Sequence, residues 1–316
     1  MQNRVTSFDR AIHSFRKSAR YMLAVISLLV TSQSLGSENG GFGNYGIGVQ
    51  TIAAGMLPPV GMTLFNAYAV NYRADRFLDD QGKELIPNFK ADIHLQALRV
   101  LHTWGTYKGI SISSSVIFES TYATIEAAGQ KDSDYGPTLI EIDPIHLGIN
   151  IGDWHLQTAT YVWLPLGNYD PADLAHSSQN YATVSQSMAV TWLPTPQWEV
   201  TLDANVSFNF RNSETDYRSG DLFGLTYSAG YRPFPSHPQW QLGINGLYVQ
   251  QFNDDEIDDQ KVPTGFRLRK LSAGPQAVYW FSPAVAAALK WQHEVHVRNG
   301  PKGDSIWLQA AFPIAL

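Results

Sequence analysis

Two short motifs combine residue types that bind metal ions. His293 and His296 stand three residues apart in H-E-V-H, but positions three apart on a strand point to opposite faces, so the two rings cannot share one ion. The acidic run D-D-E-I-D-D at 254–259 carries carboxylates of the kind that ligate Ca²⁺. We interpret this run instead as a solvated loop, or as one that bridges phosphate groups of its surroundings through divalent ions. The sequence therefore predicts no metal site and leaves Ca²⁺ binding by this loop open.

A third motif and the composition exclude other kinds of chemistry. G-F-G-N-Y-G at 41–46 matches the dinucleotide pattern G-x-G-x-x-G, but that pattern needs a preceding strand and a following helix, and the flanking residues predict neither. We therefore expect no cofactor. The chain has no cysteine, which excludes thiolate sites and disulfides. Its net charge of −6 and the absence of a basic stripe after the first residues argue against a nucleic-acid partner.

The polar side chains belong to segments in which apolar and polar residues alternate with a period of two. From Trp198 to Arg211 every even position is apolar and every odd position is polar or charged, which predicts a strand with two unlike faces. Comparable segments recur along the chain and predict about twelve strands, an even number as in outer-membrane barrels. They lie near 61–72, 89–102, 109–122, 137–150, 154–164, 180–193, 198–211, 221–232, 239–252, 265–281, 285–298 and 305–316.

The connections between these segments alternate in length. The long ones are 73–88, 125–136, 165–179, 212–220 and 253–264, with a shorter one at 298–303. The short ones lie near 103–108, 151–153, 194–197, 233–238 and 282–284. Short periplasmic turns and longer external loops are typical of outer-membrane barrels. The fold class that we predict is all-β, a transmembrane antiparallel β-barrel of about 12 strands over residues 61–316 in the bacterial outer membrane.

Aromatic residues support this orientation. Many of them lie within a few residues of the short connections, where rings with an apolar body and a polar edge form a girdle at the membrane boundary. They are Trp104, Tyr107, Trp154, Trp192, Trp198, Tyr231, Trp240, Trp280 and Phe281. In this arrangement the apolar side chains of each strand face lipid, and the polar side chains that alternate with them face a water-filled interior.

The amino-terminal residues fall into two segments before the barrel. Residues 1–36 are interpreted as a signal peptide, with a basic leader, an apolar run at 22–30 too short to cross a bilayer, and small residues before Gly36. Residues 37–60 are interpreted as an N-terminal segment that folds into the lumen as a plug, because a twelve-stranded barrel leaves a bore that a short segment could narrow. A periplasmic tail is the alternative.

Charged and polar residues of inward parity are the candidate lumen lining. They are Asp92, His94, Glu119, His155, Glu199, Asp203, Arg211, Lys290, Glu294 and Arg298. Mixed charges on an interior wall either tune a water-filled path or rigidify the barrel through ion pairs, and the sequence does not separate these two roles.

An outer-membrane lipase is the enzymatic alternative, because barrels of this size with lipase activity exist. It needs a serine and a histidine of outward parity near the external rim. His293 has outward parity, but the adjoining strands 284–297 and 304–316 offer no outward serine. We therefore assign no catalytic residue. A barrel that binds ligands at its surface is a further alternative.

Four stretches carry a family resemblance. They are L-P-L-G-N-Y-D-P (164–171), T-D-Y-R-S-G-D (215–221), G-I-N-G-L-Y-V-Q-Q-F-N-D-D (243–255) and L-S-A-G-P-Q-A-V-Y (271–279), with E-N-G (38–40) and P-P-V-G (58–61) before them. From about Glu38 to its end the chain resembles the SphA-like outer-membrane proteins of the "Putative MetA-pathway of phenol degradation" family. Asn168 and Ala182 depart from the Asp and Trp of the family pattern.

The resemblance implies a barrel that moves small hydrophobic or aromatic compounds across the outer membrane, and no enzyme activity. The expected partners are outer-membrane lipid and lipopolysaccharide, the outer-membrane assembly machinery that reads the last strand, and small hydrophobic solutes.

Overall fold

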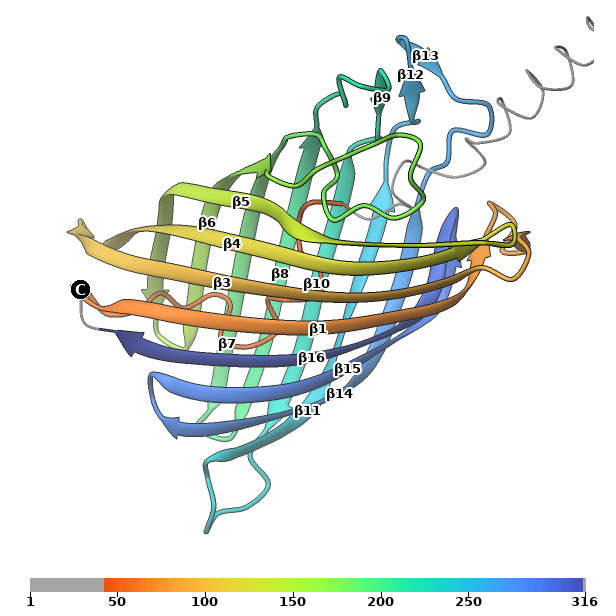
Figure 1. The fold of residues 1–316 in the computed structure, drawn as a ribbon. Helices are drawn as coiled ribbons and strands as arrows, with labels where there is room; N and C mark the ends of the chain where they lie inside the picture. Colours follow the sequence, from red (N-terminus) through yellow and green to blue (C-terminus); the bar gives the residue numbers. More distant parts are fainter. Residues whose placement is uncertain (1–42, 315–316) are drawn as a thin grey trace, which may run out of the picture. The chain divides into compact units, whose positions relative to one another are not determined.

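Twelve antiparallel strands close into a barrel within residues 43–314, the part of the chain that the computed structural model describes (Figure 1). The predicted signal peptide, residues 37–42 and residues 315–316 lie outside the described residues. The barrel strands are β1 (Thr63–Leu78), β3 (Lys90–Tyr107), β4 (Ile110–Ala127), β5 (Gln130–Ile151), β6 (Trp154–Pro165), β7 (Thr183–Thr195), β8 (Trp198–Asn209), β10 (Leu222–Tyr231), β11 (Trp240–Gln251), β14 (Arg269–Ser282), β15 (Val285–Arg298) and β16 (Gly300–Ile314). The predicted fold class is confirmed. Over the described residues, no helix has the length and apolar character needed to span a membrane.

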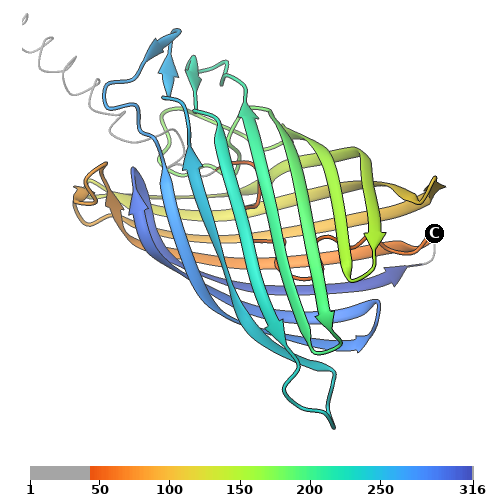
Figure 2. The ribbon, with the colours of Figure 1, turned by 180° about the vertical axis from the view of Figure 1, so that it is seen from behind.

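Closure of the barrel comes from the pairing of the first and last strands. Each barrel strand pairs with its neighbour along the chain, and β1 pairs with β16 as well as with β3. The β1–β16 register runs from Thr63 opposite Ile314 to Leu78 opposite Gly300. Figure 2 shows the opposite wall, from β6 to β11 in green to cyan. Because the ladder continues around the whole barrel, the sheet has no open edge in a medium without water.

The connections differ between the two ends of the barrel, as expected, but two predicted loops are wrong. The long connections lie at 79–89, 166–182, 210–221 and 252–268. All of them except 166–182 contain short strands: β2 (Glu84–Ile86), β9 (Tyr217–Arg218), and β12 (Glu256–Ile257) with β13 (Gln260–Lys261). The expected loops at 125–136 and 298–303 are instead mostly strand. Ala128 and Gly129 both have positive φ, 51° and 80°, which is the geometry of a two-residue hairpin turn, so β4 and β5 continue almost to the turn.

The two faces of the wall meet different surroundings. Outward side chains such as Leu98, Met188 and Leu308 are exposed and apolar, whereas inward side chains such as Thr201 and Asn245 are polar and fully buried. This is the reverse of a soluble protein and matches a barrel with a lipid-facing exterior.

An aromatic girdle surrounds the end with the short turns. Trp154 stacks on Trp192 with 5.2 Å between ring centroids, and Trp198 packs on Tyr231 at 4.7 Å. Trp104, Tyr107, Trp240 and Phe281 are also exposed there. Trp280 is an exception, because its position shares the inward parity of Val278 and its side chain lines the lumen. The girdle places the short-turn end at a membrane boundary.

Candidate functional site in the barrel lumen

Residues 43–60 lie inside the barrel (the orange-red trace in Figure 1). The Asn44 amide donates to Thr183 Oγ1 of β7 at 2.9 Å, and the Tyr45 hydroxyl donates to Asp203 of β8 at 2.7 Å. Farther along, the Ala53 N–H donates to Glu199 of β8 at 2.7 Å. The segment therefore runs along the β7–β8 wall, whose inward residues are small and polar.

Hydrogen bonds from the wall to main-chain atoms hold the middle of the segment. Lys290 Nζ of β15 donates to the carbonyls of Gly48 and Val49 at 2.9 and 3.1 Å, and Gln309 of β16 donates to the same Val49 carbonyl at 3.2 Å. The Gly48 N–H donates to Thr226 Oγ1 of β10 at 2.9 Å. Asn44 contacts β7, whereas Val49 contacts β16, which lies on the opposite side of the twelve-stranded ladder, so the segment crosses the bore between these residues.

Gly55 lets the segment pack directly on the wall. Its N–H donates to Thr191 Oγ1 at 2.9 Å. A Cβ at this position would lie 2.1 Å from the His155 carbonyl oxygen and 2.4 Å from the Thr191 nitrogen. Only glycine permits so close an approach of two backbones.

Two cavities lie between the segment and the wall that runs from β14 through β15, β16, β1, β3, β4 and β5 to β6. The larger, of about 410 Å³, reaches the short-turn end and is lined mainly by apolar side chains such as Leu57, Met62 and Leu101. The smaller, of about 70 Å³, lies toward the long loops and is lined by residues that include Glu119 and Trp307. Val49, Gln50, Tyr68 and Arg99 line both cavities. These four residues, which we call the partition, separate the two cavities.

Arg99 belongs to a buried polar cluster beside the partition. Its guanidinium donates to Ser115 Oγ at 3.0 and 3.1 Å and lies 3.7 Å from Asp143 Oδ2. His146 Nδ1 lies 2.8 Å from the same Asp143 oxygen, and His146 Nε2 contacts Gln157 Oε1. Because each group is held by a neighbour, Arg99 has a fixed position at the boundary between the cavities.

One carboxylate of the smaller cavity has an unpaired oxygen. Glu141 is almost fully buried, and its Oε1 has no hydrogen-bond partner among residues 43–314. Buried polar atoms usually have a partner. This oxygen, on the lining of the cavity, can accept a hydrogen bond from a solute or from water.

The structure distributes the ten predicted lumen residues over three places. Glu119, Glu199, Asp203, Lys290 and Glu294 lie on the inner face, and His155 has inward parity beside the turn at Gly152. Arg211 and Arg298 lie at the long loops, where Arg211 pairs with Asp259, and Arg298 donates to the Asp80 carbonyl at 2.8 Å. Asp92 and His94 lie on the outer face.

The assignment of Asp92 and His94 to the lumen is corrected. Arg73 lies 3.2 Å from Asp92 on the outside of the barrel, and the side chains of Asp92 and His94 are 41% and 48% exposed. Both parities of β3 carry apolar residues, so alternation alone does not orient this strand. The buried Arg99 does orient it, because a charge near the middle of the membrane must point inward, and Asp92 has the opposite parity.

A bulge changes the parity at the end of β15. The register with β14 shifts between Leu271 and Ser272, so Val297 is buried while His296 is exposed. Arg298 consequently leaves the inner face and reaches the loop after β1. Strict alternation does not detect such a bulge.

Sequence reasoning missed several buried charges: Arg99, Glu141, Asp143 and Lys270. Lys270 forms an ion pair with Glu294 at 2.9 Å. The available signal was a charge isolated in an apolar run, as in L-Q-A-L-R-V-L at 95–101. In β5 the register shift between Ile142 and Ile145 hides the common orientation of Asp143 and His146.

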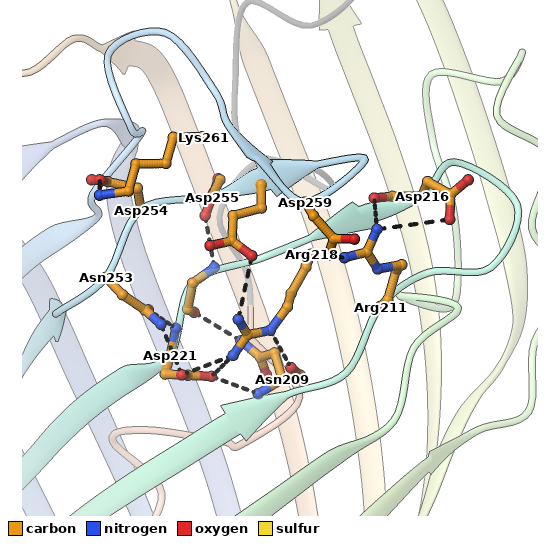
Figure 3. A network of polar contacts seen from close by, with 12 residues as sticks. Asn209, Arg211, Asp216, Arg218, Asp221, Asn253, Asp254, Asp255, Asp259 and Lys261 are labelled. Atoms are coloured by element: carbon orange, nitrogen blue, oxygen red, sulfur yellow. Dashed lines mark hydrogen bonds and ion pairs between the residues drawn. The ribbon is translucent and has the colours of Figure 1, made fainter.

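The acidic run at 254–259 lies in a network of polar contacts among the long loops (Figure 3). Asp254 pairs with Arg267 at 2.6 Å and with Lys261 at 3.1 Å, and these partners hold the pKa of Asp254 below its ordinary value. Asp255 accepts from the Gly220 N–H at 2.7 Å, and Asp259 pairs with Arg211. In the described part of the chain, no group of three or more His, Cys, Asp or Glu residues is arranged to hold a metal ion. The carboxylates join β9, β12 and their flanking loops instead.

The outward His293 forms a pair with Asp304, with Nδ1 and Oδ1 2.8 Å apart. Its register neighbours are Ala273 on β14 and Asp304 on β16. Neither is the serine that a lipase would require.

Comparison with known proteins identifies the family. The family model described as "Putative MetA-pathway of phenol degradation" matches residues 74–310. The chain belongs to this family. The resemblance expected from the sequence is thereby confirmed. Among curated proteins, none matches this chain.

A solved structure of an outer-membrane channel shares the fold. An outer membrane channel from Pseudomonas putida F1 has a TM-score of 0.72 and 18% sequence identity, over 82% of this chain and 97% of that chain. The NanC porin has a TM-score of 0.43 and 9% identity, over 80% of this chain and 100% of the porin. At 18% identity, the likeness to the Pseudomonas putida channel is one of fold alone.

Proposed function

We propose that the protein is an outer-membrane channel for small hydrophobic or aromatic compounds, with residues 43–60 as a plug that narrows the bore. The observation that carries this proposal is the larger cavity, about 410 Å³ with a mainly apolar lining, which ends at the partition. A mainly apolar concave site with a few fixed polar groups suits a small apolar molecule that carries one polar group.

The polar groups around the partition support a path rather than a closed core. Arg99 offers a donor to the larger cavity, and Glu141 offers an acceptor to the smaller one. A phenol-like solute moving along β3 would exchange one polar contact for the next while its ring stays against apolar side chains. The family description is an association with phenol degradation, which agrees with this solute class.

Two adjacent positions on β3 give a matched test. Ala97 lines the smaller cavity, whereas Leu98 faces lipid. We expect Ala97→Phe to fill the path and to reduce both the ion conductance in planar bilayers and the uptake of labelled phenol by cells that produce the protein. Leu98→Phe adds a similar ring on the outside and leaves both unchanged. Equal conductance and uptake for the two variants would reject a path through this cavity.

A further inference from the structure

The outer wall becomes charged toward the long-loop end of β15, β16, β1, β3 and β4. In the register of the sheet, His293 lies opposite Asp304, Asp304 opposite Arg73, and Arg73 opposite Asp92. These outward side chains form one row across four neighbouring strands. The row is linked by contacts of 2.8 Å between His293 and Asp304 and 3.2 Å between Arg73 and Asp92.

A second row lies one step closer to the loops. Lys302 is opposite Arg76, and Glu126 is opposite both Lys90 and Lys131. Glu126 contacts each of these two lysines at 3.1 Å. Together the rows line a groove of about 710 Å³ on the barrel exterior. We call this groove, with its two rows, the outer charged belt.

The height of the belt is fixed by strand geometry. On β3, Asp92 stands 12 positions before Trp104, which belongs to the aromatic girdle of the other end. At about 3.3 Å per residue and a tilt of about 40°, this spacing corresponds to about 30 Å along the membrane normal. The outward positions between them begin with the polar His94 and Gln96 beside the belt, continue with the apolar Leu98 and Val100, and end with His102 beside Trp104. The belt therefore lies where the hydrocarbon ends and the headgroups of the outer leaflet begin.

We propose that the outer charged belt binds the phosphorylated headgroup of lipopolysaccharide. Its cations are available, since the side chains of Arg73, Lys90 and Lys131 are 68%, 65% and 65% exposed. Exposed ion pairs are weak, so a phosphate can take over these cations with charge-assisted hydrogen bonds.

The composition of the belt favours a lipid phosphate. The groove has more cationic side chains than carboxylates, whereas the whole chain carries a net charge of −6. Its five cationic residues are Arg73, Arg76, Lys90, Lys131 and Lys302, and its four carboxylates are Asp75, Asp92, Glu126 and Asp304. The carboxylates can share divalent cations with the phosphates, which suits Ca²⁺ or Mg²⁺ with oxygen ligands. This inference depends on insertion of the barrel in the outer membrane and is independent of which solute the lumen passes.

The test is binding of lipid A to the detergent-solubilised barrel after removal of bound lipopolysaccharide, measured by native mass spectrometry. We expect bisphosphorylated lipid A to bind, and dephosphorylated lipid A and inorganic phosphate to bind at least tenfold more weakly. The triple variant Arg73→Gln, Lys90→Gln, Lys131→Gln should lose at least tenfold in affinity. Lys108→Gln, in a short turn at the opposite end, should bind as the wild type does.

A second variant separates the effect of removing a belt cation from the effect of changing the net charge, and a folding assay excludes misfolding as the cause. Arg73→Gln combined with Asp92→Asn keeps the net charge and removes one cation of the belt, and we expect it to weaken binding severalfold. Heat-dependent migration in electrophoresis reports whether each variant is folded. Binding of dephosphorylated lipid A as tight as that of the phosphorylated form, or wild-type affinity in the folded triple variant, would overturn the proposal. Binding of inorganic phosphate with equal affinity would overturn the lipid as the source of the anion.

Discussion

Lys290 is a buried amine on the inner wall whose hydrogen-bond partners are backbone carbonyls. It donates to Gly48 and Val49, and its Nζ lies 4.7 Å from the centre of the Trp307 ring. A hydrogen bond within a protein contributes about 0.5–1.5 kcal/mol to stability. The residue therefore stabilises the position of the segment at Gly48 and Val49.

Substitution Lys290→Met is expected to loosen residues 43–60 without opening the barrel wall. Loss of the donors leaves two carbonyls without this partner, so the segment should leave its position more often. Planar-bilayer recordings should show larger or more frequent conductance steps than in the wild type. Lys302→Met, on the outer face of the adjacent strand, is the control and should conduct as the wild type does. An unchanged conductance in Lys290→Met would show that Lys290 does not hold residues 43–60 in a position that limits conductance.

A buried ion pair gives a second residue-scale prediction. Glu294 accepts from Lys270 at 2.9 Å, from the Tyr72 hydroxyl at 3.1 Å and from the Gly303 N–H at 2.7 Å. Removal of one partner of such a pair leaves an uncompensated buried charge, so Lys270→Met should cost about 3–5 kcal/mol of the free energy of unfolding. Urea unfolding of the barrel refolded in lipid vesicles measures this cost. The double variant Lys270→Met, Glu294→Gln should recover most of it, and a further loss would contradict the argument.

At the scale of single residues, sequence reasoning orients some side chains and not others. The strict alternation of 198–209 places Glu199 and Asp203 on the inner face, where the structure has them. Asp92 and Arg298 are placed wrongly, because β3 has apolar residues in both parities and β15 contains a bulge. Side-chain parity is reliable only where one face is distinctly polar and the register is uninterrupted.

At the scale of elements, the extended β4–β5 hairpin fixes the loop at 166–182. Asp132 of β5 accepts from the N–H groups of Leu174 and Ala175 at 3.0 Å each, and Asp134 accepts from the Ser177 N–H at 2.7 Å. These contacts lie near the hairpin turn, at the level of the outer charged belt. The loop at 166–182 is therefore attached to a neighbouring hairpin by carboxylates.

Acid should release this loop. Backbone N–H groups, first that of Ala175, lower the pKa of Asp132. A lowered folded-state pKa means that the contribution is complete above the ordinary range of an aspartate and is lost as the pH falls through the lowered value. Hydrogen exchange of 172–177, corrected for its intrinsic pH dependence, should stay constant from neutral pH to about pH 4 and increase below. Asp132→Asn should show faster exchange already at neutral pH, whereas Asp153→Asn, in a short turn, should not. Exchange that is insensitive to both changes would refute the attachment.

Elements were predictable where the alternation was long, and less so at their ends. Each barrel strand had a period-two segment in the sequence, and the short turns were found within a few residues. The loop at 125–136 was mistaken because polar residues there continue as a solvated hairpin, which has no apolar face to mark it. Polarity beyond the membrane does not distinguish a strand from a loop.

For the whole molecule, strand number and order follow from the sequence because neighbours along the chain are neighbours in the sheet. The path of residues 43–60 does not follow, since its partners Thr191, Thr226 and Lys290 lie 136 to 242 residues away. Such contacts leave no periodic signal. They require the closed barrel to be known first.

Deletion of residues 43–60 is the whole-molecule prediction. The barrel closes through β1 and β16 and needs no part of the segment for that pairing. The shortened chain, refolded from denaturant into vesicles, should form the same sheet by circular dichroism and should conduct severalfold more than the full chain, because water fills the polar bore. A conductance equal to that of the full chain would show that the segment does not limit the passage.

The wall binds residues 48–55 mainly through main-chain atoms, as the contacts of Gly48, Val49, Ala53 and Gly55 illustrate. The glycines are required by the close approach, and Thr51 and Ala54 are buried, but Gln50, Ile52 and Met56 are not, so these three side chains can be exchanged without loss of the main-chain attachment. Substitution of Gln50, Ile52 or Met56 alone could therefore change which solutes the lumen admits without altering any strand.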